Sequence, residues 1–310
     1  MAIAIGIAAL LWSGYWLFGS RQATAEVRAW FDSRATDGWT ANFGELSTQG
    51  YPNRFDTTIT APEIAVPSGA VRWKTPFIQI LRLSYKPEHA ILIFPGSQTV
   101  FVAGQKIAVS SDRFRASTVF EQAEITVLDR ANLEADGVNF QIPLFGEINI
   151  GKALVAIRKT SALASAHDFA IELRDIDGLN GLAVKTVAID ATAKLNAPLG
   201  LDVFNAGGID VTEITFRRLQ LGSDAFDISA SGSLIMDSIG LPSGTLDLKI
   251  RNSAEVVQLA TGLGLMTPEN RASIEAELTR VTNAQDTAEP IELQIEVRRG
   301  ALFLGAVQLR

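Results

Sequence analysis

The stretch GYPNRFDTTIT at residues 50–60 places a Gly, an aromatic ring, a Pro and an amide directly before a run rich in Thr and Ile. Arg54 and Asp56 are its two charged residues, and a guanidinium beside a carboxylate could line a polar site. On a strand their side chains share one face and can pair with each other. Gly50 and Pro52 fit the start of a strand, since Pro has no amide hydrogen to donate. The pattern favours a sheet corner with a local ion pair, and a polar functional site is the alternative.

Other residue types that serve catalysis or metal binding are sparse. His89 and His167 are the only histidines, and no HxxxH or HExxH spacing surrounds them, so we expect each at the surface or at a strand end. Single acids on alternating strands normally form the solvated face. This is the expectation for Glu45, Asp56, Glu63, Glu124 and Asp129. No GxSxG, P-loop or GxGxxG motif precedes a helix, and Gly262-Leu263-Gly264 is typical of a helix C-cap. We therefore expect no catalytic, cofactor-binding or metal-binding residue, and no cofactor.

Composition excludes several classes of protein. A chain of 310 residues with 47% hydrophobic and 20% charged positions can bury a large core. Its net charge of −7 is spread along the chain without a basic block, so we expect no nucleic-acid partner. The absence of Cys excludes disulfides and thiolate chemistry, so stability must come from packing.

The first 20 residues, MAIAIGIAALLWSGYWLFGS, carry no charged side chain. About 20 apolar residues suffice for a helix to cross a bilayer, so the sequence predicts a membrane helix over residues 2–19. Three aromatic residues, Trp12, Tyr15 and Trp16, lie on the later part of it, where amphipathic rings settle at the headgroup level. The alternative is a cleaved signal peptide with a small-x-small site at Ala23-Thr24-Ala25. The missing basic leader and the length of the apolar run favour the anchor.

The charge around this helix bears on its orientation. Arg21, Arg28 and Arg34 follow it and no basic residue precedes it in the sequence, so the count of Lys and Arg favours a cytoplasmic C-terminal side. A basic leader upstream would reverse that count.

Hydrophobic periodicity predicts the remaining elements. Residues 20–37 continue as a juxtamembrane helix with Val27, Trp30 and Phe31 on one stripe, and this helix ends near Asp37-Gly38. From residue 38 the period changes to two, as where Phe55, Thr57 and Ile59 share one strand face. Similar strands are predicted at 90–94, 99–103, 106–111, 113–120, 124–142, 168–176, 182–195, 208–222, 226–237, 244–252, 291–299 and 301–310. Short polar turns between them favour antiparallel pairing.

Two helices interrupt the later strands, at 253–262 and 268–283. Asn252 and Glu255 have the spacing of a capping box, and Thr267-Pro268 places Pro at a first helical position. The predicted fold is thus mainly β (α+β): an N-terminal membrane helix, then a long antiparallel curved sheet with two C-terminal helices packed on it. The expected domains are a transmembrane helix at 1–19, a juxtamembrane helix at 20–37 and a β-rich domain at 38–310, with room for two sub-domains that meet near 145–165.

Four stretches of the first half carry a family resemblance: WSGYW (12–16), GYPNRFDTTIT (50–60), RWKTPFIQILRLSYKPEHAI (72–91) and RASTVFE (115–121). They resemble domain-of-unknown-function family 2125, bacterial envelope proteins with an N-terminal helical anchor. The later stretches SASGSLIMDSIGLPSGTLDLKI (229–250) and RRGALFLGAVQL (298–309) are more loosely similar to AsmA-like envelope proteins. These likenesses imply a periplasmic location after about residue 20 and a β-sheet curled into a lipid-facing groove. They supply no catalytic motif.

Two functions remain open from the sequence. The first is a membrane-anchored, non-enzymatic scaffold or lipid-binding module of the inner membrane, with residues 2–19 in the bilayer and a lipid or another envelope protein as partner. Strands apolar on both faces, such as Ala90-Ile91-Leu92-Ile93-Phe94, favour it. The second is a carboxylate-dependent enzyme of the cell envelope. An apolar trough would favour the first function, and acids that converge in a polar cleft would favour the second.

Overall fold

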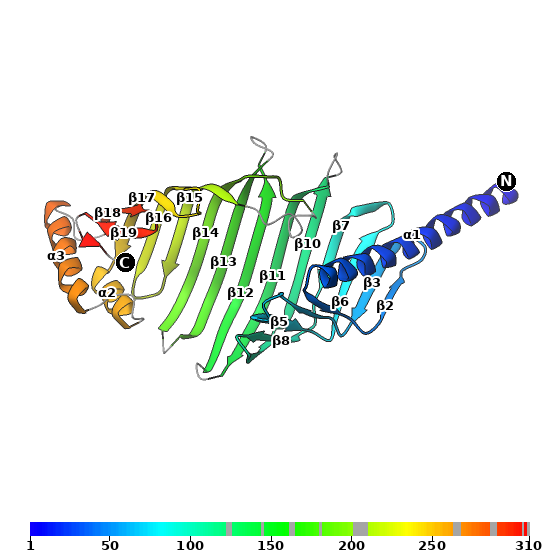
Figure 1. Cartoon of the computed structure of the whole chain (residues 1–310), viewed down its shortest axis with the longest axis horizontal. Helices are drawn as coiled ribbons and strands as arrows, with labels where there is room; N and C mark the ends of the chain where they lie inside the picture. Colours follow the sequence, from blue (N-terminus) through cyan, green and yellow to red (C-terminus); the bar gives the residue numbers. More distant parts are fainter. Residues whose placement is uncertain are drawn as a thin grey trace. The chain divides into compact units, whose positions relative to one another are not determined.

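The computed structural model describes residues 1–121, 126–143, 146–160, 165–179, 182–200, 210–262, 268–285, 290–305 and 307–308. Its elements are mainly β-strands, with one long N-terminal helix and two later helices, which confirms the predicted fold class (Figure 1). Every strand pair in it is antiparallel. The chain divides into two compact units, Met1–Ala153 (unit 1) and Leu154–Arg310 (unit 2).

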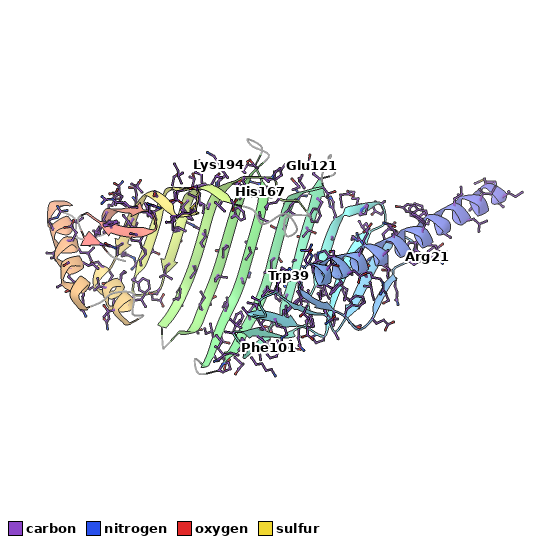
Figure 2. The ribbon with its side chains drawn as sticks, in the orientation of Figure 1. Arg21, Trp39, Phe101, Glu121, His167 and Lys194 are labelled. Carbon is purple, nitrogen blue, oxygen red and sulfur yellow. The ribbon has the colours of Figure 1, made fainter. Side chains whose placement is uncertain are left out.

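A single helix, α1 (Ala2–Thr36), contains the predicted membrane helix together with its continuation. It is followed by Asp37 and by Gly38, whose φ of +82° lies in the left-handed region that Gly adopts without steric cost. The predicted helix end is therefore confirmed, and Trp39 follows directly (Figure 2). At 1.5 Å per residue, α1 is about 52 Å long. Its first part is exposed, whereas four residues of its second part are buried, namely Ser20, Ala23, Phe31 and Arg34.

The strands of unit 1 form one antiparallel sheet. They are β1 (Thr40–Asn42), β2 (Leu46–Gln49), β3 (Arg54–Thr60), β4 (Glu63–Ala65), β5 (Val71–Lys74), β6 (Phe77–Leu83), β7 (Lys86–Ile93), β8 (Ser97–Val102), β9 (Gln105–Ser110), β10 (Arg113–Glu121) and β11 (Val127–Ile142). Their pairings connect them in the order β2-β3-β6-β7-β10-β11-β9-β8-β5-β4-β1. Because β11 is long, it pairs with β10 along its first part and with β9 along its last part.

The second half of α1 supplies part of the core of this sheet. Phe31 is buried with Ile59 of β3 and Ile78 of β6, and Val27 packs against the same cluster. The Phe31 and Phe43 rings lie 4.9 Å apart, a distance at which aromatic pairs attract each other. The predicted apolar stripe is therefore right for Val27 and Phe31, but wrong for Trp30. The Trp30 side chain is exposed and touches the Phe31 ring from outside.

One glycine of α1 is required by this packing. The Phe55 ring of β3 lies against Gly19 so closely that a Cβ at position 19 would collide with the ring. Next along the helix, the Thr24 hydroxyl lies 2.8 Å from that of Thr48, which in turn lies 2.9 Å from that of Thr57. The helix thus contacts β2 and β3 through a close backbone approach and a short hydroxyl chain.

Unit 2 is an antiparallel meander. Strand β12 (Gly146–Lys159) contains the division between the units. The following strands each pair with the next: β13 (Ala166–Leu179), β14 (Leu182–Leu195), β15 (Val211–Gly222), β16 (Asp227–Met236), β17 (Pro242–Arg251), β18 (Ile291–Arg298), β19 (Ala301–Leu304) and β20 (Val307–Gln308). The sequence prediction lacks β12, because Gly151-Lys152 breaks its alternation and a continuous apolar run follows. It also lacks β2, β4, β5 and β6 of unit 1.

Two helices pack at the C-terminal end of this meander. The observed helices, α2 (Ser253–Gly262) and α3 (Pro268–Gln285), confirm the predicted ones, the second being two residues longer. Val257 of α2 is buried with Ile274 and Leu278 of α3, and Leu293 of β18 packs against them. These helices therefore cover the last strands of unit 2, and strands β13 to β15 are drawn with no helix over them (Figure 1).

Candidate functional site

The residues at 50–60 form the sheet corner that the sequence predicts. Residues 51–53 make a turn and β3 begins at Arg54. Phe55, Thr57 and Ile59 are buried on the face toward α1. On the opposite face the Arg54 Nε lies 3.1 Å from an Asp56 oxygen, in a pair that is partly exposed to solvent. This pair is a local ion pair at the surface, and it does not line a polar cleft.

The two histidines are not placed as catalytic or metal-binding groups. His89 is exposed and lies 3.8 Å from Glu88, as expected for a surface residue. His167 lies near the start of β13 as expected, but it is buried, with its ring 6.5 Å from that of Phe169. Among the described residues no cluster of three or more His, Asp or Glu could hold a metal ion.

The candidate acids do not converge. Glu63 pairs with Lys74 at 2.8 Å, Asp129 lies 3.7 Å from Arg130, and Glu45 is exposed. Glu124 lies outside the described residues. Gly262 is the last residue of α2, and the following Leu263-Gly264, which the C-cap prediction also includes, lie outside the described residues.

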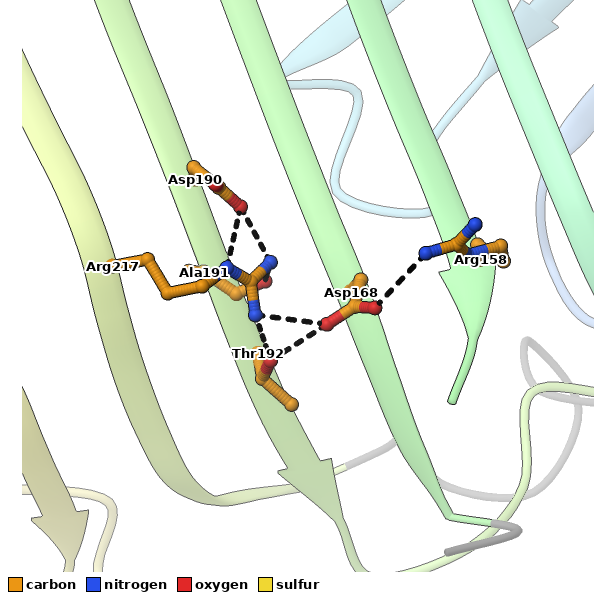
Figure 3. A network of polar contacts seen from close by, with 6 residues as sticks. All are labelled: Arg158, Asp168, Asp190, Ala191, Thr192 and Arg217. Atoms are coloured by element: carbon orange, nitrogen blue, oxygen red, sulfur yellow. Dashed lines mark hydrogen bonds and ion pairs between the residues drawn. The ribbon is translucent and has the colours of Figure 1, made fainter. Parts of the chain in front are cut away.

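Unit 2 holds a charged network that the sequence does not reveal (Figure 3). The Thr192 hydroxyl donates to Asp168 at 2.6 Å, and Arg217 donates to the same carboxylate at 3.0 Å and also to Asp190. Arg158 lies 3.6 Å from the other Asp168 oxygen. The hydrogen bond from Thr192, and then those from the two guanidinium groups, lower the pKa of Asp168. Asp168 is thus held as a carboxylate.

This network resists prediction because it depends on a β-bulge. The register between β14 and β15 shifts between Asp190 and Ala191, so that Arg217 has no direct partner opposite it. The extra residue turns the Arg217 side chain toward two aspartates on neighbouring strands. All of its acids are paired with cations, so the network stabilises the sheet surface and offers no free acid for proton transfer.

A cavity of about 530 Å³ lies in unit 1. It is lined largely by polar side chains, among them Glu63, Lys74, Gln98 and Asn139. Glu63 and Lys74 pair with each other, and the Gln98 Oε1 accepts a hydrogen bond from the Trp73 indole at 2.8 Å. Ligand sites normally combine an apolar lining with a few polar groups that bind the ligand, whereas Glu63, Lys74 and Gln98 of this cavity already have partners within the protein.

The sheet of unit 2 has one apolar and one polar face. One row across six strands, β13 to β18, consists of Ile171, Ile189, Leu219, Ala230, Leu248 and Leu293. The next row of the same face consists of Leu173, Val187, Leu221, Ile228, Ile250 and Ile291. A row of the opposite face consists of Asp168, Thr192, Thr215, Ser233, Thr245 and Glu296.

The degree of burial changes along the apolar rows. All side chains of the first row are half-buried, and in the second row only Ile250 and Ile291 are fully buried. Ile250 lies on β17, which directly precedes α2, and Ile291 lies on β18, against which α2 and α3 pack. Toward β13 the large apolar side chains touch their neighbours within the sheet and remain partly accessible. We call the half-buried part of this face, on β13 to β16, the open apolar face.

Ring hydrogen bonds join the first part of α1 to two turns of unit 1. The Trp12 indole donates to the Pro52 carbonyl at 2.7 Å, and the Trp16 indole donates to the Arg54 carbonyl at 2.8 Å. The Tyr15 hydroxyl donates to the Ser84 carbonyl at 2.5 Å. We call the five rings at this level the aromatic collar, namely Trp12, Tyr15 and Trp16 of α1 with Tyr51 and Tyr85 of the turns.

The sequence does not predict the hydrogen bonds of the aromatic collar. The pattern of Trp12, Tyr15 and Trp16 predicts that these rings lie at the membrane surface, but it does not indicate which turns accept their hydrogen bonds. The spacing of Trp12, Tyr15 and Trp16 at i, i+3 and i+4 is the available signal, because three rings with polar hydrogens on one helix face need acceptors nearby.

These observations define the class: a protein with one N-terminal helix that is long and apolar enough to span a membrane, and with a β-rich body whose second unit has one apolar and one polar face. The family model described as "Uncharacterized protein conserved in bacteria (DUF2125)" matches residues 16–309, and the chain belongs to this family. No curated protein and no solved structure matches the chain. The comparisons confirm the resemblance to family 2125 and do not show the looser likeness to AsmA-like proteins.

Proposed function

We propose that this protein is a non-enzymatic, membrane-anchored lipid-binding module of the cell envelope, in which the open apolar face of unit 2 binds acyl chains. Helix α1 remains in the inner membrane, and the residues after about 20 lie in the periplasm. That orientation follows the resemblance to envelope proteins in preference to the count of Arg after the helix.

The observation that carries this proposal is the pair of apolar rows. The open part of each row crosses the four strands β13 to β16, which at about 4.8 Å between neighbours is about 14 Å. This is close to half of the roughly 30 Å hydrocarbon core, which is the depth that acyl chains of one leaflet fill. The open part of a row can therefore lie against most of an acyl chain.

The chemistry of the rows favours hydrocarbon over a protein partner. Neither row contains a hydrogen-bonding side chain, so an occupant that carried polar groups would lose their hydration without gaining a partner. Acyl chains have no such groups. The membrane anchor on the same chain keeps the sheet close to a supply of lipid.

The alternative of a carboxylate-dependent enzyme lacks support in the described residues. The two neighbouring acids of the network in unit 2, Asp168 and Asp190, are both bound by Arg217 on the polar face. A general acid needs a raised pKa, whereas that of Asp168 is lowered.

Photolabelling tests the proposal directly. The full chain, reconstituted in vesicles that contain a phospholipid with a diazirine in its acyl chain, is irradiated and digested, and the labelled peptides are identified by mass spectrometry. We expect label on β13 to β16 as well as on α1. Label on α1 alone would contradict acyl-chain binding by unit 2 while leaving the anchor intact.

A matched pair of variants completes this test. Ile189→Asn places an amide in the middle of the first apolar row, and Ser231→Asn places the same group on the exposed polar face of β16. We expect Ile189→Asn to reduce labelling of unit 2 and Ser231→Asn to leave it unchanged. Equal labelling of both variants would show that the open apolar face is not the site. Thermal melts of both verify that they fold.

A further inference from the structure

We propose that the aromatic collar is a second membrane contact, in which the turns at residues 51–53 and 84–85 of unit 1 rest in the lipid headgroup layer beside α1. The partner is the lipid surface itself. This inference rests on the anchoring of α1 in the membrane, and it is independent of acyl-chain binding by unit 2.

Hydrogen bonds fix the turns at a defined level of the helix. The acceptors for Trp12 and Tyr15 are the carbonyls of Pro52 and Ser84, one from each turn. The Ser13 and Tyr51 hydroxyls lie 2.9 Å apart and add a further link at the same level. The turns therefore lie beside residues 12–16 of α1.

The membrane boundary on α1 lies beyond this level. Leu17 and Phe18 are 47% and 73% exposed, and both belong to the uncharged first part of α1, where exposed apolar side chains are best accommodated in lipid. The first charged residue of the helix is Arg21. Trp16 lies five positions and Trp12 nine positions before it, which is about 7.5 Å and about 13.5 Å along the helix. If lipid reaches Phe18, then the turns lie within the headgroup layer or at its inner boundary.

The exposed side chains of the turns suit that layer. Tyr51 is 57% and Tyr85 is 58% exposed, and Leu83 beside the second turn is 38% exposed. Tyr has an apolar ring and a polar tip, and it is enriched where a membrane meets water. In water the apolar surface of these three side chains would stay hydrated, and the free energy of its burial would not be gained.

Backbone carbonyls of the turns also have hydrogen-bond donors within the protein, as an environment poor in water requires. Carbonyls outside regular structure are tolerated near hydrocarbon only when protein groups satisfy them. The carbonyls of Pro52, Arg54 and Ser84 each accept a hydrogen bond from an α1 ring, and the Ser84 amide donates to the Asn53 carbonyl at 2.9 Å. The collar thus supplies the hydrogen bonds that water supplies to ordinary surface turns.

The natural absence of Cys allows this to be tested with single-cysteine variants. A nitroxide label is attached to the full chain at Asn53→Cys, Tyr85→Cys, Gln105→Cys or Ile7→Cys, and the proteins are reconstituted in vesicles of phosphatidylcholine and phosphatidylglycerol. Gln105 is the aqueous control, because it begins β9 near the labelled Phe101 of β8, away from Arg21 (Figure 2). Ile7 is the control for the anchor. Power saturation with oxygen and with a nickel chelate measures the depth of each label.

We expect the labels at positions 53 and 85 to be protected from the nickel chelate to a degree between those at Ile7 and Gln105. Labels at both turns that are as accessible as the one at Gln105, while Ile7 is deep in lipid, would overturn the collar contact and leave the anchor standing. An accessible Ile7 label would overturn the anchor, and with it both proposals. Thermal melts verify that each variant folds.

Discussion

The two units differ in how far the apolar face of their sheet is covered. Each unit has an antiparallel sheet with apolar side chains on one face. In unit 1 the chain itself covers that face, since α1 places Val27 and Phe31 against Ile59 and Ile78. In unit 2 the helices α2 and α3 cover only the last strands, and Ile189 and Leu219 stay half-buried.

The difference is that a helix covers apolar residues of the sheet in unit 1, whereas the open apolar face of unit 2 stays partly accessible. Burial of apolar surface stabilises by roughly 25 cal/mol per Å², so a half-buried row leaves part of that free energy unrealised. Large exposed apolar areas on soluble proteins usually mark binding or membrane-contacting surfaces. The open apolar face is therefore the basis of the proposed function, and the core of unit 1 holds α1 against the sheet.

The largest effect is expected at the junction of anchor and sheet. Phe55→Ala removes a buried ring that lies against Gly19 and near Trp16. Truncation of a buried Phe costs about 3–5 kcal/mol of unfolding free energy. Thermal and denaturant melts in detergent measure this loss.

The matched control is the neighbouring Asp56→Asn. Its partner Arg54 lies on the partly solvated face, and an exposed ion pair contributes about 0–1 kcal/mol. If Phe55→Ala were as stable as the parent, the docking of α1 on β3 would be wrong. A folded Asp56→Asn protein that no longer retains lipid would instead support a functional polar site at this corner.

A second prediction compares one substitution in the two sheets. Ile59→Ala in the closed core of unit 1 should cost about 2–5 kcal/mol, as buried Ile truncations do. Ile189→Ala on the open apolar face should cost about 1 kcal/mol, because part of that side chain is already accessible. The two are compared in the same detergent.

Added phospholipid sharpens this comparison. If acyl chains occupy the open apolar face, lipid should raise the melting temperature of the parent and increase the cost of Ile189→Ala, while the cost of Ile59→Ala stays the same. Equal costs for both substitutions without lipid would mean that the face of unit 2 is closed, and would remove the basis for the proposed function.

Much of the fold follows from the sequence because periodicity is a local signal. The change of period at residue 38 and the caps near Asn252 and Pro268 correctly predict where the strands follow α1 and where α2 and α3 begin. Strand β12 was missed since a glycine interrupts its alternation, and Trp30 was misplaced because a three-residue stripe cannot tell the centre of a helix face from its edge.

The candidate site depends on contacts between distant residues, and these leave little local signal. The uncharged helix and its rings were evident, but the bonds from Trp12 to Pro52 and from Tyr15 to Ser84 require the register of β2, β3 and β6. The apolar face of unit 2 is visible as alternation within each strand. That it stays open depends on where α2 and α3 pack, which alternation does not determine.

The smallest effect is expected on the polar face of unit 2, in the network around Asp168. The Thr192 hydroxyl and the Arg217 and Arg158 guanidinium groups stabilise the ionised carboxylate and lower its pKa in the folded state. Because this pKa is lower than the unfolded-state value of about 3.9, the ionised Asp168 stabilises the folded state at pH values above about 3.9. This contribution is lost as the pH falls through the lowered pKa. Because the network is partly exposed, Asp168→Asn should cost about 1 kcal/mol or less at pH 7.

The pH dependence distinguishes this electrostatic effect from a packing effect. At a pH below the lowered pKa the parent carboxyl is protonated as well, so the melting temperatures of the parent and of Asp168→Asn should converge. Asp247→Asn is the control, since Asp247 lies on the same polar face outside the network and accepts a hydrogen bond from Gln294. A difference that persists unchanged from pH 7 into the acid range would show that Asp168 acts through packing. A loss of lipid labelling in unit 2 on Asp168→Asn, with the fold intact, would move the functional site from the open apolar face to the polar one.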